Sequence, residues 1–147
     1  MAVTSKLEVA SELLTEALRL FLEGKSYFAS LNLAGAAEGI LGKFIENIGG
    51  VPAFKNMRDT AVLFLERDDD GGSVPRGDPV RDMADLINSA KNSTKHGIID
   101  VEFDPKEEAQ DLIDRAIENY YTLQSQFDLR QIDQLHQYHE IRYRRKS

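Results

Sequence analysis

The stretch SYFASLNLAGAAEGILGKFIENI, residues 26–48, decides the fold. Its large apolar side chains recur at steps of three and four residues, which is the spacing of one face of an α-helix. They are Tyr27, Leu31, Ala34, Leu41, Ile45 and Ile48. Small residues on its other faces would let neighbouring helices approach closely. They are Gly35, Ala36, Ala37, Gly39 and Gly42. We therefore expect residues 26–48 to form the central helix of a bundle.

Segments on both sides of this helix show the same periodicity. Residues 5–24 predict a helix with Ser5 as its N-cap and Gly24 at its end. Helices are also expected at residues 54–67, where a strand over 61–65 is the alternative, and at 78–97 and 104–125, both with a proline in the first turn. A sixth, weaker helix would begin at Asp128. The expected fold is therefore all-α, an up-and-down bundle of five to six helices.

The connections are predicted from composition. Residues 68–79 combine consecutive aspartates with glycines and prolines, and we expect a mobile loop there. Residues 99–103 alternate apolar and acidic side chains, which predicts a short half-buried extended segment. The expected organisation is one helical bundle domain over residues 1–127, with a C-terminal helix and basic tail over 128–147 packed on it or extending from it.

Composition excludes several classes of protein. The chain has 147 residues and no cysteine, which excludes thiol nucleophiles, zinc–thiolate sites, iron–sulfur clusters and disulfides. With 41% hydrophobic and 29% charged residues it reads as a soluble globular protein. No segment approaches the roughly 18 apolar residues of a membrane span, and the N-terminus lacks the apolar run of a signal peptide. We expect a cytoplasmic protein that does not contact a membrane.

The charge is negative overall but unevenly distributed. The net charge is −7, so a polyanion would have to find a local basic patch. Residues 86–99 contain no acid and include Lys91, Lys95 and His96. A second basic patch is the tail with Arg142, Arg144, Arg145 and Lys146, which is either solvated or a contact for phosphate.

Glu38 lies on the apolar side of the central helix, where a carboxylate needs a partner. One interpretation is an acid at the edge of the core, paired with a Lys, Arg or Tyr of a neighbouring helix. The other interpretation places Glu38 beside an active or binding site.

The segment from Lys91 to His96 is the main candidate site. It offers an ammonium group, amide, hydroxyls and an imidazole, a set that could bind a phosphate and move a proton. The alternative is an ordinary helix end, because Lys, His and Gly are common there. On one regular helix Lys91 and His96 point about 140° apart, so either the helix unwinds near Thr94 or a second chain completes the site. Asn92 and His96 do share a face.

No cofactor or metal site is expected. Gly42 and Lys43 lack the flanking residues of a phosphate-binding loop. His136 and His139 could supply two ligands from one helical face, but no carboxylate at suitable spacing completes the set.

A helical bundle with Lys91, Asn92 and then His96 five positions after the lysine resembles the HEPN superfamily, and so does the stretch from Ala29 to Lys43. The likeness covers roughly residues 26–125. It implies a homodimer whose two motifs face one another in a groove. Active members are metal-independent endoribonucleases, toxins or defence proteins. Inactive members bind nucleotides, RNA or a nucleotidyltransferase partner.

The resemblance also assigns roles to residues. His96 would be the general acid or base, Lys91 would stabilise charge on the phosphate, and Asn92 would orient His96. Two further binding residues are expected from the sequence itself and not from the resemblance: Lys95 in the acid-free segment, and Glu38 under its second interpretation. Lys91 stands where active members have arginine, and a lysine lacks the two-pronged fork that binds phosphate.

Two functional hypotheses follow. The first is a HEPN-like homodimer that binds RNA or a nucleotide, with endoribonuclease activity weakened or lost. The second is a non-catalytic module that dimerises and docks a partner protein such as a nucleotidyltransferase.

Overall fold

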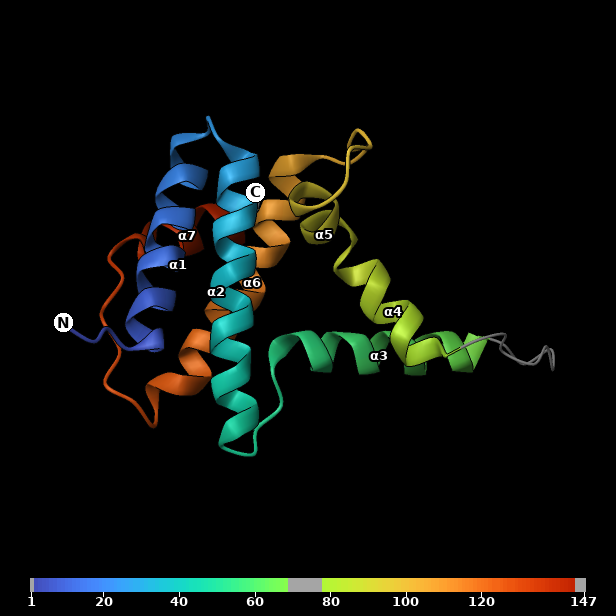
Figure 1. Cartoon of the computed structure of the whole chain (residues 1–147), viewed down its shortest axis with the longest axis horizontal. Coiled ribbons are helices and arrows are strands. Elements are labelled where there is room, and N and C mark those ends of the chain that lie inside the picture. Colours follow the sequence, from blue (N-terminus) through green and yellow to red (C-terminus); the bar gives the residue numbers. More distant parts are fainter. Residues whose placement is uncertain (1, 69–77, 145–147) are drawn as a thin grey trace.

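The computed structural model describes residues 2–68 and 78–144, and this part of the chain contains seven α-helices and no strand. The all-helical bundle predicted from the sequence is confirmed (Figure 1). The helices are α1 (Lys6–Glu23), α2 (Tyr27–Asn47), α3 (Ala53–Asp68), α4 (Pro79–Ile87), α5 (Ser89–Lys95), α6 (Pro105–Gln124) and α7 (Gln134–Tyr143).

The ends of α1 and α6 follow the signals in the sequence. The side chain of Ser5 accepts a hydrogen bond from the Glu8 N–H at the start of α1. Gly24 ends α1 with a φ of 75°, a left-handed conformation that glycine adopts without steric cost. Asp104 caps α6 through the N–H groups of Lys106 and Glu107. These caps satisfy backbone groups that would otherwise lack partners.

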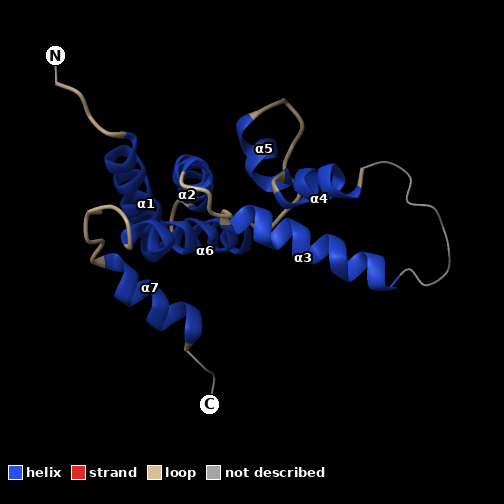
Figure 2. Ribbon diagram, turned by 90° about the horizontal axis from the view of Figure 1, so that it is seen from below, coloured by secondary structure: helices blue, strands red, loops and turns tan. Residues whose placement is uncertain are grey.

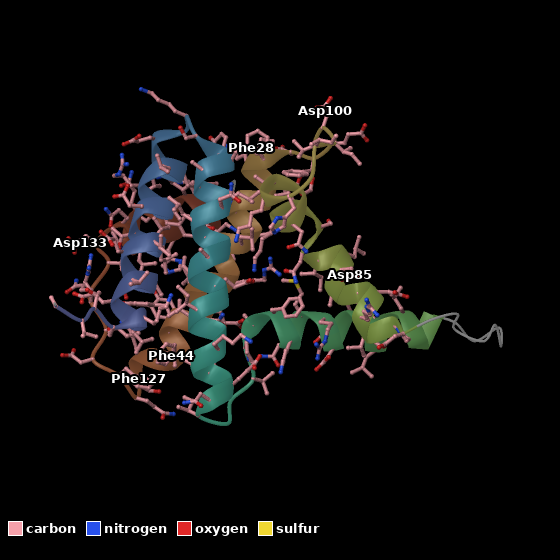
Figure 3. The ribbon with its side chains drawn as sticks, viewed as in Figure 1. Phe28, Phe44, Asp85, Asp100, Phe127 and Asp133 are labelled. Atoms are coloured by element: carbon pink, nitrogen blue, oxygen red, sulfur yellow. The ribbon has the colours of Figure 1, made fainter. Side chains whose placement is uncertain are left out.

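Helices α1, α2 and α6 form the core of the bundle. α1 and α2 are joined by a tight turn and run antiparallel, and the buried Ser30 hydroxyl donates to the Ala17 carbonyl across their interface at 2.7 Å. α6 runs in the same direction as α2. Phe28 packs on Phe103 at one end. Phe44 packs on Phe127 at the other end (Figure 3). The segment α3–α5 returns the chain to the end where α2 began.

α3 departs from this core. It leaves the far end of α2 and projects away from the bundle, and α4 packs along it (Figures 1 and 2). The sequence of this segment repeats apolar residues at helical spacing, with Met57, Phe64 and Leu65 among them. Ala53 and Val62 are buried, but Met57, Phe64 and Leu65 are exposed. The helix is confirmed, but within residues 2–68 and 78–144 most of this stripe stays exposed.

α7 packs on α1 on the side of the bundle away from α5 (Figure 2). Tyr138 is fully buried there, with its ring against Phe21, and its hydroxyl donates to the Asp114 carboxylate. Removal from water, together with this hydrogen bond, raises the pKa of Tyr138 well above its usual range. The C-terminal helix is therefore attached to the bundle by a buried aromatic side chain.

The structure corrects several boundaries. The helix predicted over residues 78–97 is broken at Asn88 into α4 and α5. Residues 99–103 form no strand, and Ile99 is 87% exposed, although Val101 and Phe103 are partly buried. The last helix begins at Gln134 and not at Asp128. The predicted loop at 68–79 and the tail residues Arg145 and Lys146 fall largely or wholly outside the described residues.

No helix among the described residues is both long enough and apolar enough to cross a membrane.

Candidate functional site

A buried ion cluster joins three helices around Glu38. The Glu38 carboxylate on α2 is 5% exposed, and its Oε2 lies 2.8 Å from Nε of Arg115 on α6. Its Oε1 lies 3.5 Å from Nζ of Lys91 on α5. A carboxylate at this depth requires compensation by opposite charge. The first interpretation of Glu38, an acid paired with a Lys, Arg or Tyr of a neighbouring helix, is confirmed, and the partners are one Lys and one Arg.

A glycine of α2 lies directly under the Lys91 side chain of α5. A Cβ at Gly35 would lie 3.1 Å from Cδ of Lys91, so the missing side chain leaves room for the lysine stem. The stem lies along α2 while the ammonium group reaches Glu38, and the Lys91 side chain is 19% exposed. The role expected for small residues in α2 is therefore met at Gly35, whereas Gly39 faces open space.

Asn119 connects the cluster to the start of α3. Its side chain is buried, accepting a hydrogen bond from the Ala53 N–H at 2.9 Å and donating one to the Glu38 carbonyl at 3.3 Å. Gly42 lies beside this connection, and a Cβ there would be in ordinary van der Waals contact with Pro52 and the Asn119 amide, at 3.5 and 3.7 Å. The backbone at Glu38 and the first residue of α3 are thus fixed by one amide.

A pocket of about 160 Å³ opens beside the cluster. It lies where α2, the start of α3, the α4–α5 junction and α6 meet. Glu38, Lys91 and Asn119 line it together with Lys43, Phe54 and Asn88. With Glu46, its lining therefore combines two ammonium groups, two carboxylates, two amides and an aromatic ring, a set that can bind a small polar group.

The remaining residues of the predicted motif lie on a different face of α5. Asn92, Lys95 and His96 are exposed. α5 is helical at Thr94, whose hydroxyl donates to the Ala90 carbonyl at 2.8 Å, but it ends at Lys95, and His96 is extended with φ −130° and ψ 151°. Among the described residues, no side-chain hydrogen bond or ion pair connects Lys91 with Asn92 or His96. Within one chain, therefore, Lys91 of the motif faces the ion cluster at Glu38, whereas Asn92 and His96 are exposed.

The two C-terminal histidines have separate partners. His136 pairs with Glu140 at 3.4 Å, and His139 shares a 3.0 Å hydrogen bond with the Tyr121 hydroxyl. Within residues 2–68 and 78–144, no three His, Asp or Glu side chains gather as a metal site would require.

A larger open groove of about 720 Å³ lies between α3, α6 and α7. Met57 and Phe64 of α3 line one side, and Tyr121, His139 and Tyr143 line the other. The His139 ring stacks on both tyrosines, with ring centroids 6.0 and 5.6 Å apart. This groove is mainly apolar and aromatic, unlike the pocket beside Glu38.

Sequence reasoning missed Arg115, Asn119 and Asn88. A signal for the first two existed, because they lie four residues apart within the apolar stripe of α6 and so had to be buried with partners. The break at Asn88 had a weak signal, since Asn88 and Ser89 are adjacent residues of types that favour helix caps over helix interiors.

Comparisons with known proteins identify no relative. No protein-family model matches the chain, and no curated protein or solved structure matches it. The likeness to the HEPN superfamily rests on the residue pattern of α2 and α5.

Proposed function

We propose that this protein is a HEPN-like homodimer that binds RNA or a nucleotide through the surface of α5. The observation that carries this proposal is the exposure of Asn92, Lys95 and His96 on one acid-free segment of an acidic chain. Cationic and amide groups of this kind contact phosphates and bases. Lys91 adds positive charge beneath this surface, because Lys91 and Arg115 together exceed the charge of Glu38.

Binding is better supported than cleavage. General acid–base catalysis needs the imidazole and the group that stabilises the phosphate to converge on one reacting centre. In one chain the Lys91 ammonium group points to Glu38, while His96, directly after the end of α5, is exposed. A second chain would have to bring its own His96 to the first chain's Lys91, which is the arrangement that the resemblance implies.

If such a dimer cleaves RNA, the chemistry can be written without a metal. One imidazole removes the proton of the ribose 2′-hydroxyl, whose oxygen attacks the adjacent phosphorus. The bond from phosphorus to the 5′-oxygen breaks, and that oxygen receives a proton from a protonated imidazole. The products are a 2′,3′-cyclic phosphate and a 5′-hydroxyl. Lys91 would stabilise the charge that develops on the phosphate oxygens.

The binding proposal is tested with fluorescein-labelled single-stranded RNA by anisotropy at several salt concentrations. We expect Lys95→Ala to weaken binding and to reduce the slope of log K against log salt by about 0.7, the contribution of one phosphate contact on a single strand. Lys6→Ala, an exposed lysine at the start of α1, is the matched control and should leave the slope unchanged. Absence of binding, or equal effects of the two substitutions, contradicts the proposal.

The cleavage proposal is tested separately. Purified protein is incubated with total RNA in the presence of a chelator, beside His96→Ala. Cleavage by the wild-type protein that the variant lacks supports an endoribonuclease. Equal cleavage by both, or none by either, leaves RNA binding without catalysis.

The second candidate function is docking of a partner protein, and one observation favours it. Leu63, Phe64 and Leu65 of α3 are 61, 67 and 58% exposed, and α4 has no buried residue. Exposed apolar clusters of this kind mark surfaces that bind other proteins. A protein that associates through α3 and has no affinity for RNA would favour this function over the first.

A further inference from the structure

One side of α3, which we call its groove face, is uncharged and lines the open groove between α3, α6 and α7. Its residues recur every three to four positions, as on one side of a helix, and they are Ala53, Asn56, Met57, Thr60, Ala61 and Phe64. Other sides of the same helix carry charges, among them Lys55, Arg58 and Asp59. Depletion of charge distinguishes the centre of a protein interface from the rest of a surface. The groove face therefore has the composition of a contact surface.

The charged residues of α6 that line the groove leave little charge to compensate. Asp114 is paired with Arg142, whose Nε lies 2.9 Å from Oδ2 of the aspartate. Arg115 is paired with the buried Glu38. Glu118 is exposed and can stay hydrated at the polar rim that protein interfaces usually have. An uncharged surface can therefore dock in this groove.

The apolar surface around the groove is large enough for a dimer contact. Six side chains there are between 42 and 67% exposed: Met57, Leu63, Phe64 and Leu65 of α3, Tyr121 of α6 and Tyr143 of α7. At roughly 200 Å² for a fully exposed side chain of this size, they present about 700 Å² to water. A stable protein contact buries about 800 Å² on each partner. Burial of this surface by a second copy would supply most of that area.

The order of side-chain sizes along the groove face fits a second copy of the same helix. Its centre is small, with Thr60 and Ala61 at the middle of α3, and Met57 and Phe64 lie one turn to either side. If two such helices pack antiparallel about a two-fold axis between residues 60 and 61, each Met57 meets the partner's Phe64. The small residues then meet their own copies and let the helices approach closely. Two acidic chains can meet in this way, because no charged residue of the groove face lies at the axis.

We propose that the groove of each chain receives α3 of a second copy in this antiparallel arrangement. The outer end of the partner's α3 then enters the groove, so that its Phe64 packs on Met57 and on the wall formed by Tyr121 and Tyr143. The contact is isologous, because the same surface of each chain is buried by the other. This inference rests on the homodimer of the proposed function and identifies the surface that joins its two chains.

The arrangement has a consequence for the RNA-binding surface. As far as the structure describes the chain, the lining of the groove includes no residue of α5. α5 and α7 lie on different sides of the bundle (Figure 2). Both α5 surfaces therefore stay accessible in this dimer, and the contact does not place His96 of one chain at the partner's Lys91. A dimer joined here offers two separate surfaces to RNA.

Engineered cysteines can test the contact directly, because the chain contains none of its own. At an interaxial distance of about 8 Å, which small residues permit, equivalent residues at the axis fall within the Cα separation of about 4.4–6.8 Å that a disulfide needs. Ala61→Cys should therefore form a disulfide between chains in a glutathione redox buffer. Thr60→Cys, at an exposed position, should do the same and guards against misfolding of the first variant. Leu63→Cys is the matched control, exposed on the same helix but outside the groove face.

Non-reducing gels measure the fraction of covalent dimer at micromolar protein. Two cysteines held at the axis have an effective concentration near millimolar, so Ala61→Cys and Thr60→Cys should give at least about tenfold more covalent dimer than Leu63→Cys. Met57→Cys and Phe64→Cys should each remain monomeric on the gel, because each lies roughly 10 Å along the helix from its own copy. Mixed together they should form a disulfide, which a mass tag on one chain identifies. This result would establish the antiparallel direction.

Two results would overturn the inference. Ala61→Cys and Thr60→Cys could cross-link no better than Leu63→Cys, or Met57→Cys could cross-link with itself as in a parallel pair. If the wild-type protein is nevertheless dimeric by light scattering, the proposed homodimer stands and only the contact is assigned wrongly. A monomeric wild-type protein would overturn both. Cross-linking at the axis in a protein that does not bind RNA would support this contact and contradict only the RNA-binding function.

Discussion

Arg115 and Glu38 form an ion pair in the centre of the bundle, with Nε and Oε2 2.8 Å apart and both side chains 5% exposed. The N–H of Nε is not aligned with the carboxylate, so the contact is an ion pair without a hydrogen bond. Lys91 reaches the same carboxylate from α5. The cluster therefore joins α2 and α6 of the core to the helix that carries the candidate RNA-binding surface.

Removal of Arg115 should be severely destabilising. Arg115→Met leaves Glu38 with only the longer contact to Lys91, and breaking a buried pair in this way costs about 3–5 kcal/mol. Urea unfolding at neutral pH measures the loss. Lys91→Met should cost less, because Lys91 is 3.5 Å from the carboxylate and partly exposed.

A double variant separates charge burial from lost packing. Glu38→Gln combined with Arg115→Met removes both charges, and it should recover part of the stability that Arg115→Met loses. A loss below about 1 kcal/mol for Arg115→Met would show that Glu38 is not an uncompensated buried charge in that variant.

Asn119 should be needed to anchor α3. Asn119→Ala leaves the Ala53 N–H and the Glu38 carbonyl without their side-chain partner, at a cost of about 1–3 kcal/mol for each buried group left unsatisfied. Hydrogen exchange of the Ala53 amide should accelerate more than that of α1 amides. Asn92→Ala, at an exposed position, is the control and should change neither stability nor exchange. Unchanged exchange at Ala53 would mean that Asn119 does not anchor this helix.

The sequence predicted those parts of the fold that depend on local signals. The caps Ser5 and Asp104 specify where α1 and α6 begin, because a side-chain acceptor at that position satisfies the first turn. The sequence also indicated that Glu38 pairs with a Lys, Arg or Tyr, because a carboxylate buried within an apolar stripe is costly without a charged or hydrogen-bonding partner. Which cation it would be could not be derived, since α5 and α6 lie more than fifty residues further along the chain.

The features that escaped prediction depend on tertiary packing. Periodicity shows that Phe64 and Leu65 share a face of α3, but not whether that face meets its own chain, solvent or another molecule. The break at Asn88 separates α4, which packs on α3, from α5, which packs on α2. Two different packing partners divide what the sequence indicated as one helix.

Asp111 should make stability depend on pH. Desolvation is the main cause that raises the pKa of this carboxyl above its ordinary value of 3.8, and repulsion from Asp114 and Glu107 adds to it. A raised pKa in the folded protein means that folding favours the protonated form. The contribution of this group is therefore fully present below pH 3.8 and is lost as pH rises through the raised pKa.

Asp111→Asn removes the unfavourable free energy of holding an ionised carboxylate at this position in the folded protein at neutral pH. Since like charges on one helix face cost a few tenths of a kcal/mol, the melting temperature should rise by about 1 °C at pH 7. The gain should vanish near pH 3, where Asp111 is protonated in the folded and the unfolded protein. Glu12→Gln on α1 is the control, at an exposed carboxylate. An equal gain at both pH values would contradict the electrostatic cause.

The exposed face of α3 should drive self-association. Leu63, Phe64 and Leu65 are each more than half exposed, and Phe64 also lines the groove that Tyr121 and Tyr143 border. A monomer in water would leave this apolar surface hydrated, whereas a second copy would bury it. Light scattering should therefore give wild-type protein a mass near twice 16.6 kDa.

Phe64→Glu should shift the mass toward that of one chain, because dimerisation would then bury an unpaired carboxylate. Val3→Glu, at a side chain 96% exposed near the N-terminus, changes the charge equally and should leave the dimer intact. A wild-type mass of one chain at high micromolar concentration, or a Phe64→Glu variant that remains dimeric, would show that the α3 face is not the contact between subunits.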